Sequence, residues 1–277
     1  MPCLRIDDAV NLHDDIHGRA HSGGEPVLLV TGTSTSVGHR TPTIIDSLAA
    51  DRQIIAYDHR SIGASSPHTE PVSIASLAAD AAALLDELGT GSVHVVGWSL
   101  GSTVAQELAL ARPDMVAFLL LYGTWARGDG FQRRLAVALR SPWEHGDLAG
   151  GITALGVAFS PEFLDSPDFE QLAASILPPF PQTAEQIRAV AHQWAENLDH
   201  DSQDRLPGID RPTAVLVGEQ DVFTSPRQAR VVADAIPNAQ LVVEGPGASH
   251  GLHVERPVEW LHHVRSHLAR CASPLHA

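Results

Sequence analysis

Lysine is absent from this chain of 277 residues, and an excess of positive charge is missing as well. All 18 basic side chains are arginine, which excludes chemistry that needs a lysine, such as a Schiff base or the lysine of a Walker phosphate-binding loop. The net charge is −15 at pH 7, and such a charge repels polyanions and anionic surfaces. We therefore expect neither a nucleic acid nor a membrane among the partners.

Cysteine and long apolar segments are also scarce. Cys3 and Cys271 lie at opposite ends of the chain, so no CxxC motif for a metal or for redox chemistry exists. The longest apolar run, residues 115–123, is far too short to span a bilayer. Residues 1–8 carry charges and lack the apolar core of a signal peptide. These features predict a cytoplasmic protein without a bound metal.

The chain does contain a regular alternation of short β-branched runs and amphipathic segments. Residues 27–30 are continuously apolar, as expected of a strand that is covered on both faces. The predicted strands are 4–6, 11–17, 27–30, 53–57, 93–96, 116–122, 213–217 and 240–244. The predicted helices of the same rhythm are 41–50, 72–88, 102–112, 226–235 and 257–269. Strands that alternate with helices predict the α/β class, with a doubly wound and mostly parallel sheet.

Residues 125–206 interrupt this rhythm and contain no clear strand. Helical periodicity covers 131–139, 152–159, 169–176 and 184–197, and prolines at 142, 161, 178, 179 and 181 are expected to break the helices. We predict a helical cap over the carboxyl edge of the sheet, where open α/β sheets bind ligands. The core domain is then formed by residues 1–124 and 207–277. We expect the cap (residues 125–206) to set substrate choice and not the chemistry.

The segment Gly97-Trp98-Ser99-Leu100-Gly101 lies between a predicted strand and a predicted helix. Strand, G-x-S-x-G and helix in this order are what a nucleophile elbow requires, because the chain reverses so sharply at the serine that larger neighbours would clash. The serine hydroxyl is then presented beside a helix N-terminus, whose N–H groups favour negative charge. We predict Ser99 as a catalytic nucleophile.

A serine hydroxyl is a weak nucleophile at neutral pH and needs a histidine base that a carboxylate orients. In this fold the acid and the histidine each follow a later strand. The acid candidates, Glu219 and Asp221, come after the strand at 213–217. The base candidates, His250 and His253, come after the strand at 240–244. Position alone does not decide which of the two acidic residues and which of the two histidines takes part.

Further motifs carry a resemblance to a known family. Besides the elbow, these motifs are Tyr57-Asp58-His59-Arg60-Ser61-Ile62-Gly63-Ala64-Ser65, Gly218-Glu219-Gln220-Asp221 and His250-Gly251-Leu252-His253-Val254-Glu255-Arg256-Pro257. The chain resembles serine hydrolases of the α/β-hydrolase fold, and within them the bacterial esterases and lactonases around 3-oxoadipate enol-lactonase and the aclacinomycin methylesterases. The resemblance implies the catalytic triad Ser99, Asp221 and His250, because the family's H-x-x-x-x-E-x-P pattern begins at His250.

The oxyanion loop departs from the pattern of this family. Thr31-Gly32-Thr33-Ser34 stands where His-Gly is usual. Because the donors of an oxyanion hole are backbone N–H groups, a changed side chain need not abolish the hole. By the match, the donors are the N–H groups of Thr33 and Leu100, and we expect the Thr31 hydroxyl to take no part.

Aromatic residues are candidates for the substrate pocket, although packing inside the core and the cap is the other explanation for them. The candidate residues are Trp98, Trp125, Phe159 and Trp194. His59 and Arg60 could bind a substrate anion, but we expect a structural ion pair there instead.

Together these features predict a hydrolase without a cofactor or metal, either monomeric or homodimeric. Its substrate would be a carboxylic ester, lactone or thioester of a small to medium apolar molecule, in secondary or aromatic metabolism. One alternative is an acyltransferase or a cofactor-free perhydrolase of the haloperoxidase type on the same triad. Another is a non-catalytic ligand-binding form of the fold, against which the intact triad argues.

Overall fold

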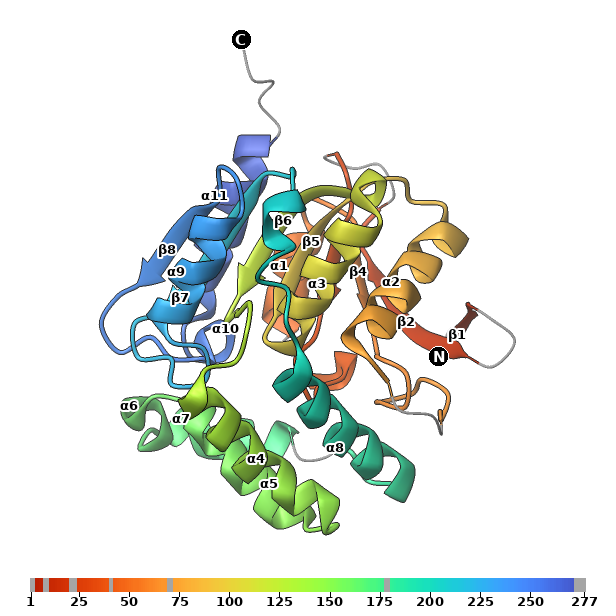
Figure 1. Ribbon diagram of the computed structural model, residues 1–277. Helices are drawn as coiled ribbons and strands as arrows, with labels where there is room; N and C mark the ends of the chain where they lie inside the picture. The colour runs from red at the N-terminus through yellow and green to blue at the C-terminus, as the bar shows by residue number, and fades with distance from the viewer. Residues whose placement is uncertain are drawn as a thin grey trace.

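One eight-stranded sheet with helices on both faces organises the molecule (Figure 1). The computed structural model describes residues 3–6, 10–19, 24–39, 42–68, 72–176 and 180–271. The strands are β1 (Cys3–Arg5), β2 (Asn11–His17), β3 (Val27–Val30), β4 (Ile54–Tyr57), β5 (Val93–Trp98), β6 (Val116–Tyr122), β7 (Thr213–Gly218) and β8 (Gln240–Glu244). Their order in space is β1-β2-β4-β3-β5-β6-β7-β8.

The sheet is parallel except at one edge. β1 and β2 pair as an antiparallel hairpin, with Leu4 opposite Leu12, and β2 is antiparallel to β4. All other neighbouring strands are parallel. Every residue of β3 and β7 is buried, which explains why these strands are continuous apolar runs. The predicted mostly parallel, doubly wound sheet of the α/β-hydrolase fold is confirmed.

Helices cover the two faces of the sheet separately. The helices of the core are α1 (Pro42–Ala49), α2 (Ile74–Leu88), α3 (Leu100–Ala111), α9 (Pro226–Ala235), α10 (Leu252–Glu255) and α11 (Pro257–Cys271), with short turns η1 (Val37–His39), η2 (Pro113–Met115) and η4 (Leu206–Gly208). α2, α3 and α9 pack on one face, whereas α1, α10 and α11 pack on the other. Within the described residues, no helix combines the length and the apolar character needed to cross a membrane.

Local capping explains where α2 begins and ends. In α2, Ser73 and Ser76 form a reciprocal capping box. The same helix ends at Gly89, whose φ of 62° is a left-handed conformation that glycine adopts without steric cost.

Between β6 and β7 the described residues form helices and add no strand to the sheet. The helices of the cap are α4 (Gly130–Glu144), α5 (Leu148–Ala154), η3 (Leu155–Ala158), α6 (Pro161–Leu164), α7 (Pro167–Ile176) and α8 (Ala184–Asp199). They form a separate layer across one end of the sheet (Figure 1). Trp143, Phe180 and Trp194 belong to their own apolar cluster, which reaches the core at Ile62 and Phe223.

One prediction about the cap is wrong, because Pro142 does not end a helix. α4 continues through Pro142 to Glu144. A proline inside a helix lacks the N–H for one backbone bond, which costs about 3 kcal/mol in mid-helix. Here it lies in the last turn, and its own carbonyl accepts from the N–H of His145 and Asp147 at 3.2 and 2.8 Å. Pro161 begins α6, as prolines commonly do, whereas Pro178 and Pro179 lie outside the described residues.

Candidate active site

Ser99 lies at the sharp turn between β5 and α3. Its φ of 55° and ψ of −122° are unusual for a residue with a side chain, and such strain is typical of functional sites. A Cβ atom at Gly97 would lie 2.3 Å from the carbonyl oxygen of Gly101, and one at Gly101 would lie 2.3 Å from that of Val30. Both glycines are therefore required by close backbone contacts, as the elbow motif predicts.

Asp221 and His250 form a buried pair beyond β7 and β8. His250 Nδ1 lies 2.8 Å from Asp221 Oδ2, and each residue is only 3% exposed. The other carboxylate oxygen accepts from the backbone N–H groups of Phe223 and Thr224, both at 2.8 Å, and the Thr224 hydroxyl donates to Oδ2 at 2.8 Å. Four donors thus hold this carboxylate in place, and the pairing directs Nδ1–H toward Asp221 and leaves Nε2 as an acceptor.

The backbone and ring of His250 are fixed by aromatic residues. The Trp98 indole N–H donates to the His250 carbonyl at 3.2 Å, and the Tyr122 hydroxyl donates to the same carbonyl. Complete burial raises the pKa of Tyr122 well above its ordinary value of 10, so this hydroxyl keeps its proton. The Phe223 ring stacks on the imidazole with centroids 4.7 Å apart.

The competing candidates, Glu219 and His253, are placed differently from the Asp221–His250 pair. Glu219 is exposed. His253 packs its ring on Trp98 with centroids 4.2 Å apart, whereas the Asp221 carboxylate is paired with His250. Among the described residues, no group of three or more histidine, cysteine or acidic side chains is placed to hold a metal ion.

One of the two predicted oxyanion donors lies at the start of a helix, and the other lies in the loop after β3. Leu100 is the first residue of α3, so its N–H has no partner within the helix. Thr33 follows β3 and lines the cavity beside Ser99. Within the described part of the chain, the Thr33 N–H donates to no protein group, whereas the next N–H, of Ser34, donates to Gln193 of the cap at 2.9 Å.

A cavity of about 550 Å³ lies between the sheet edge and the cap, and both Ser99 and His250 line it. Trp98, Phe159 and Trp194 line it as predicted. The sequence analysis did not identify the other apolar residues that line the cavity, because in the sequence each of them is simply an apolar position in a cap helix. Those cap residues include Ile152, Leu155, Leu164, Phe169 and Leu172.

Trp125 does not line this cavity. It is buried against His200, with ring centroids 6.0 Å apart, where the chain enters and leaves the cap. It borders a small cavity of about 20 Å³ that also touches Ser99. The structure therefore places Trp125 outside the wall of the main cavity, and its predicted contact with substrate stays a prediction. Arg60 forms the expected structural ion pair, with Asp80 and with both side chains largely buried.

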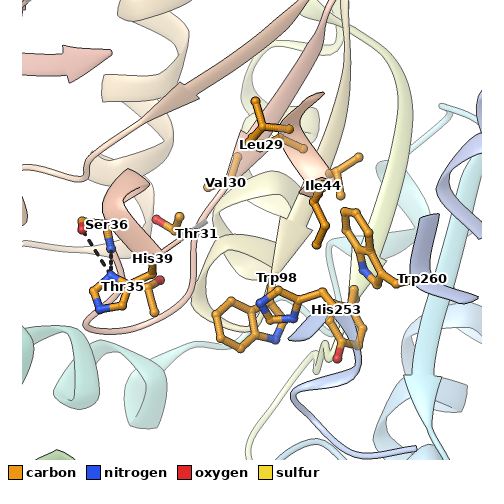
Figure 2. Close-up of a pocket in the computed structure, with 13 residues that line it drawn as sticks. Leu29, Val30, Thr31, Thr35, Ser36, His39, Ile44, Trp98, His253 and Trp260 are labelled. Atoms are coloured by element: carbon orange, nitrogen blue, oxygen red, sulfur yellow. Dashed lines mark hydrogen bonds between the residues drawn. The ribbon is translucent and has the colours of Figure 1, made fainter. Parts of the chain in front are cut away.

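A second, smaller pocket of about 70 Å³ branches off behind Trp98 (Figure 2). Apolar residues of β3 and α1 form its back wall, among them Leu29 and Ile44. Thr35, His39, Trp98 and His253 line both spaces. Thr31 borders only this smaller pocket, and its buried hydroxyl finds no hydrogen-bond partner among the described residues.

The fold and the sequence together identify the class of protein. The chain belongs to the alpha/beta hydrolase family, whose characteristic sequence matches residues 16–263. It is 32% identical over 256 residues to a protein of Azorhizobium caulinodans named as a carbamate hydrolase, RutD. The aligned region covers 90% of this chain and 91% of the relative.

Solved structures agree with this assignment. The enol-lactonase of Burkholderia xenovorans LB400 has a TM-score of 0.85 at 24% identity, over 97% of this chain and 100% of the other. A thermophilic esterase from Thermogutta terrifontis has a TM-score of 0.80 at 26% identity, over 95% of each chain. The family match makes the protein an enzyme of the hydrolase class, and the structures confirm the expected fold, which the chain shares with an enol-lactonase.

Proposed function

We propose that the protein is a serine hydrolase that cleaves a carboxylic ester, lactone or thioester of an apolar molecule through an acyl-enzyme on Ser99. The observation that carries this proposal is the arrangement of Ser99 and the Asp221–His250 pair around one cavity. A strained serine and a hydrogen-bonded histidine–carboxylate pair beside the same cavity are the groups that acyl transfer requires.

The proposed reaction begins with the histidine. Nε2 of His250 takes the hydroxyl proton of Ser99 while Oγ attacks the carbonyl carbon, and Asp221 stabilises the imidazolium that forms. The backbone N–H groups of Thr33 and Leu100 bind the oxyanion of the tetrahedral intermediate. His250 then returns the proton to the leaving group as the acyl–oxygen or acyl–sulfur bond breaks. Water attacks the acyl-enzyme by the same steps, which releases the acid and restores Ser99.

The cavity supports an apolar acyl group. Its volume of about 550 Å³ and its many apolar lining residues suit a medium-sized alkyl or ring substituent. A second candidate is carbamate hydrolysis, which the name of the relative at 32% identity supports. The same triad could attack a carbamate carbonyl, but an unsubstituted carbamate would leave most of this cavity unfilled. We therefore favour an ester or lactone, or a carbamate with an apolar substituent.

The test compares wild type with Ser99→Ala on p-nitrophenyl esters of increasing acyl length. We expect the variant to lose about a thousandfold or more of kcat, because only oxyanion and binding contributions remain. A fluorophosphonate probe should label wild type at Ser99 and leave the variant unlabelled, while both have the same unfolding temperature.

Matched substrates separate the alternatives. An N-aryl carbamate with the same leaving group tests carbamate cleavage, and added alcohol or peroxide tests acyl transfer or perhydrolysis. Turnover that is unchanged in Ser99→Ala would contradict the serine mechanism.

A further inference from the structure

The loop after β3 contains a backbone group whose hydrogen-bond partner comes from the cap. Ser34 is 0% exposed, and its φ of 63° places it in the left-handed region. Its N–H donates to the side-chain oxygen Oε1 of Gln193, in α8, at 2.9 Å. Gln193 is itself only 1% exposed. Because a buried N–H needs an acceptor, this glutamine completes the structure of a loop that precedes it by 159 residues.

A second bond joins the same helix to the neighbouring residue of the loop. The Asn197 side chain donates from Nδ2 to the Thr33 hydroxyl at 2.9 Å. Asn197 follows Gln193 by one helical turn, so both side chains lie on one face of α8. Two successive loop residues, Thr33 and Ser34, are thus held from one helix.

These bonds leave one N–H available. The peptide between Thr33 and Ser34 is fixed at both polar ends, because its N–H donates to Gln193 and its carbonyl accepts from the Ser34 hydroxyl at 2.6 Å. The next N–H, of Thr35, donates to the Gly32 carbonyl at 3.3 Å. Of the three consecutive N–H groups, only that of Thr33 donates to no described residue, and Thr33 borders the main cavity.

α8 is attached to the core by contacts that do not involve this loop. Gln186 donates from Nε2 to the Gly63 carbonyl at 2.8 Å. The carboxylate of Glu196 accepts from the N–H of Ile74, at the start of α2, at 3.3 Å. The position of α8 is therefore set independently, and the helix can act as a fixed support for the loop.

We propose that Gln193, with Asn197 in support, is a positioning residue for the oxyanion hole. By holding the Ser34 peptide, Gln193 keeps the Thr33 N–H at the cavity wall where the oxyanion forms. α8 then serves the chemistry in addition to the substrate cavity, which Trp194 of the same helix lines. This inference rests on the proposed function for the role of Thr33, but the bond from Ser34 to Gln193 does not.

The test exploits the fact that only an acceptor is needed at this position. Gln193→Leu removes the acceptor, and we expect kcat for a p-nitrophenyl ester to fall about 10- to 100-fold, with KM changed by only about threefold. Gln193→Glu keeps an oxygen at the same place and should retain most of kcat. The inhibition constant of a trifluoromethyl ketone, whose adduct with Ser99 carries an oxyanion, should rise in Gln193→Leu by the same factor.

Two measurements keep structural effects apart from positioning. Arg188→Leu replaces an exposed side chain of the same helix that pairs with Glu185 and does not contact the loop, and it should leave kcat unchanged. Amide hydrogen exchange of Ser34, followed by NMR, reports the bond without turnover. This exchange should speed up about 100-fold or more in Gln193→Leu and stay slow in Gln193→Glu and Arg188→Leu.

The outcomes are distinct. Unchanged kcat in Gln193→Leu would overturn the positioning role, whatever Ser34 exchange shows. Equal losses of kcat in the Leu and Glu variants, with an equally lowered unfolding temperature, would also overturn it, because the contact would then only stabilise the fold. If wild type fails to hydrolyse any ester or carbamate in a Ser99-dependent way, the proposed function is wrong. The exchange measurement does not depend on turnover, so it still tests the inference if the proposed function is wrong. Slow exchange of the Ser34 amide in Gln193→Leu would then overturn the inference.

Discussion

At the scale of single residues, the site combines the strained backbone of Ser99 with the buried carboxylate of Asp221, which accepts several hydrogen bonds. The conformation of Ser99 costs on the order of 1–3 kcal/mol, and the flanking strand and helix hold it in place. The Asp221 carboxylate is buried, yet two backbone N–H groups, the Thr224 hydroxyl and His250 donate to it. A buried charge without such partners would be strongly unfavourable. Asp221 and His250 therefore have the geometry of an orienting acid and a base.

This geometry predicts different effects for neighbouring residues of the same type. His250→Ala and Asp221→Asn should each lower kcat by about a thousandfold or more, because the first removes the base and the second its orienting acceptor. His253→Ala and Glu219→Gln serve as the matched controls and should keep most of the activity. Steady-state kinetics on one activated ester checks all four variants, and an inactive His253→Ala beside an active His250→Ala would reverse the assignment.

At the scale of elements, the cap contacts the loop after β3 and the loop that carries His250, and it also lines the cavity. In η3, the Ala158 carbonyl accepts from the Gly251 N–H at 2.7 Å and from the Ser249 hydroxyl at 2.8 Å, on either side of His250. The cap segment from α5 through α7, which includes η3 and Phe159, supplies most of the apolar lining. The expectation that the cap only selects the substrate is therefore too simple for the segments that contact the two loops.

The cavity-lining part of the cap should still control acyl preference. Phe159 borders the cavity and packs against the rings of Phe163 and Phe169, with centroids 5.4 and 5.9 Å away. Phe159→Ala should raise kcat/KM for longer or branched acyl groups relative to acetyl by about tenfold, because the cavity becomes larger. Phe131→Ala, on the cap surface at 64% exposure, is the matched control. Equal profiles of relative rates in both variants and wild type would contradict this role.

At the scale of the whole molecule, buried histidines link stability to pH. Burial lowers the pKa values of His94, His200 and His267 from 6.5 to about 4. These side chains are therefore neutral in the folded protein at pH values where the unfolded chain already binds protons. Their contribution to stability is fully present above pH 6.5 and is lost as the pH falls toward 4.

We therefore expect the free energy of unfolding to fall steeply between pH 6.5 and 4. Each such histidine adds up to about 1.4 kcal/mol per pH unit to the slope, the value for one proton taken up on unfolding. Urea unfolding at several pH values measures this slope. His200→Gln should reduce it by about one proton, whereas His262→Gln, at an exposed position, should not. A slope that is the same in all three proteins would contradict the assignment to His200.

The local pattern of the chain was enough to predict most of the core. Apolar runs, helical periodicity and the glycines around Ser99 act over a few residues, so the strands, the core helices and the elbow could be identified without a structure. Asp221 and His250 could be placed because parallel strands bring their carboxyl ends to one edge. The family pattern then selected these two residues over Glu219 and His253.

The tertiary structure alone decided the support of the site. The Tyr122 hydroxyl meets a carbonyl 128 residues away, and Gln193 meets a backbone N–H 159 residues away. Bonds over such separations depend on how whole helices dock, which no local pattern encodes. The docking of the cap also explains why Trp125 lies outside the wall of the main cavity and why several other cap residues line it. Sequence determined which groups could react, and the packing of the cap on the sheet determined which side chains hold and surround them.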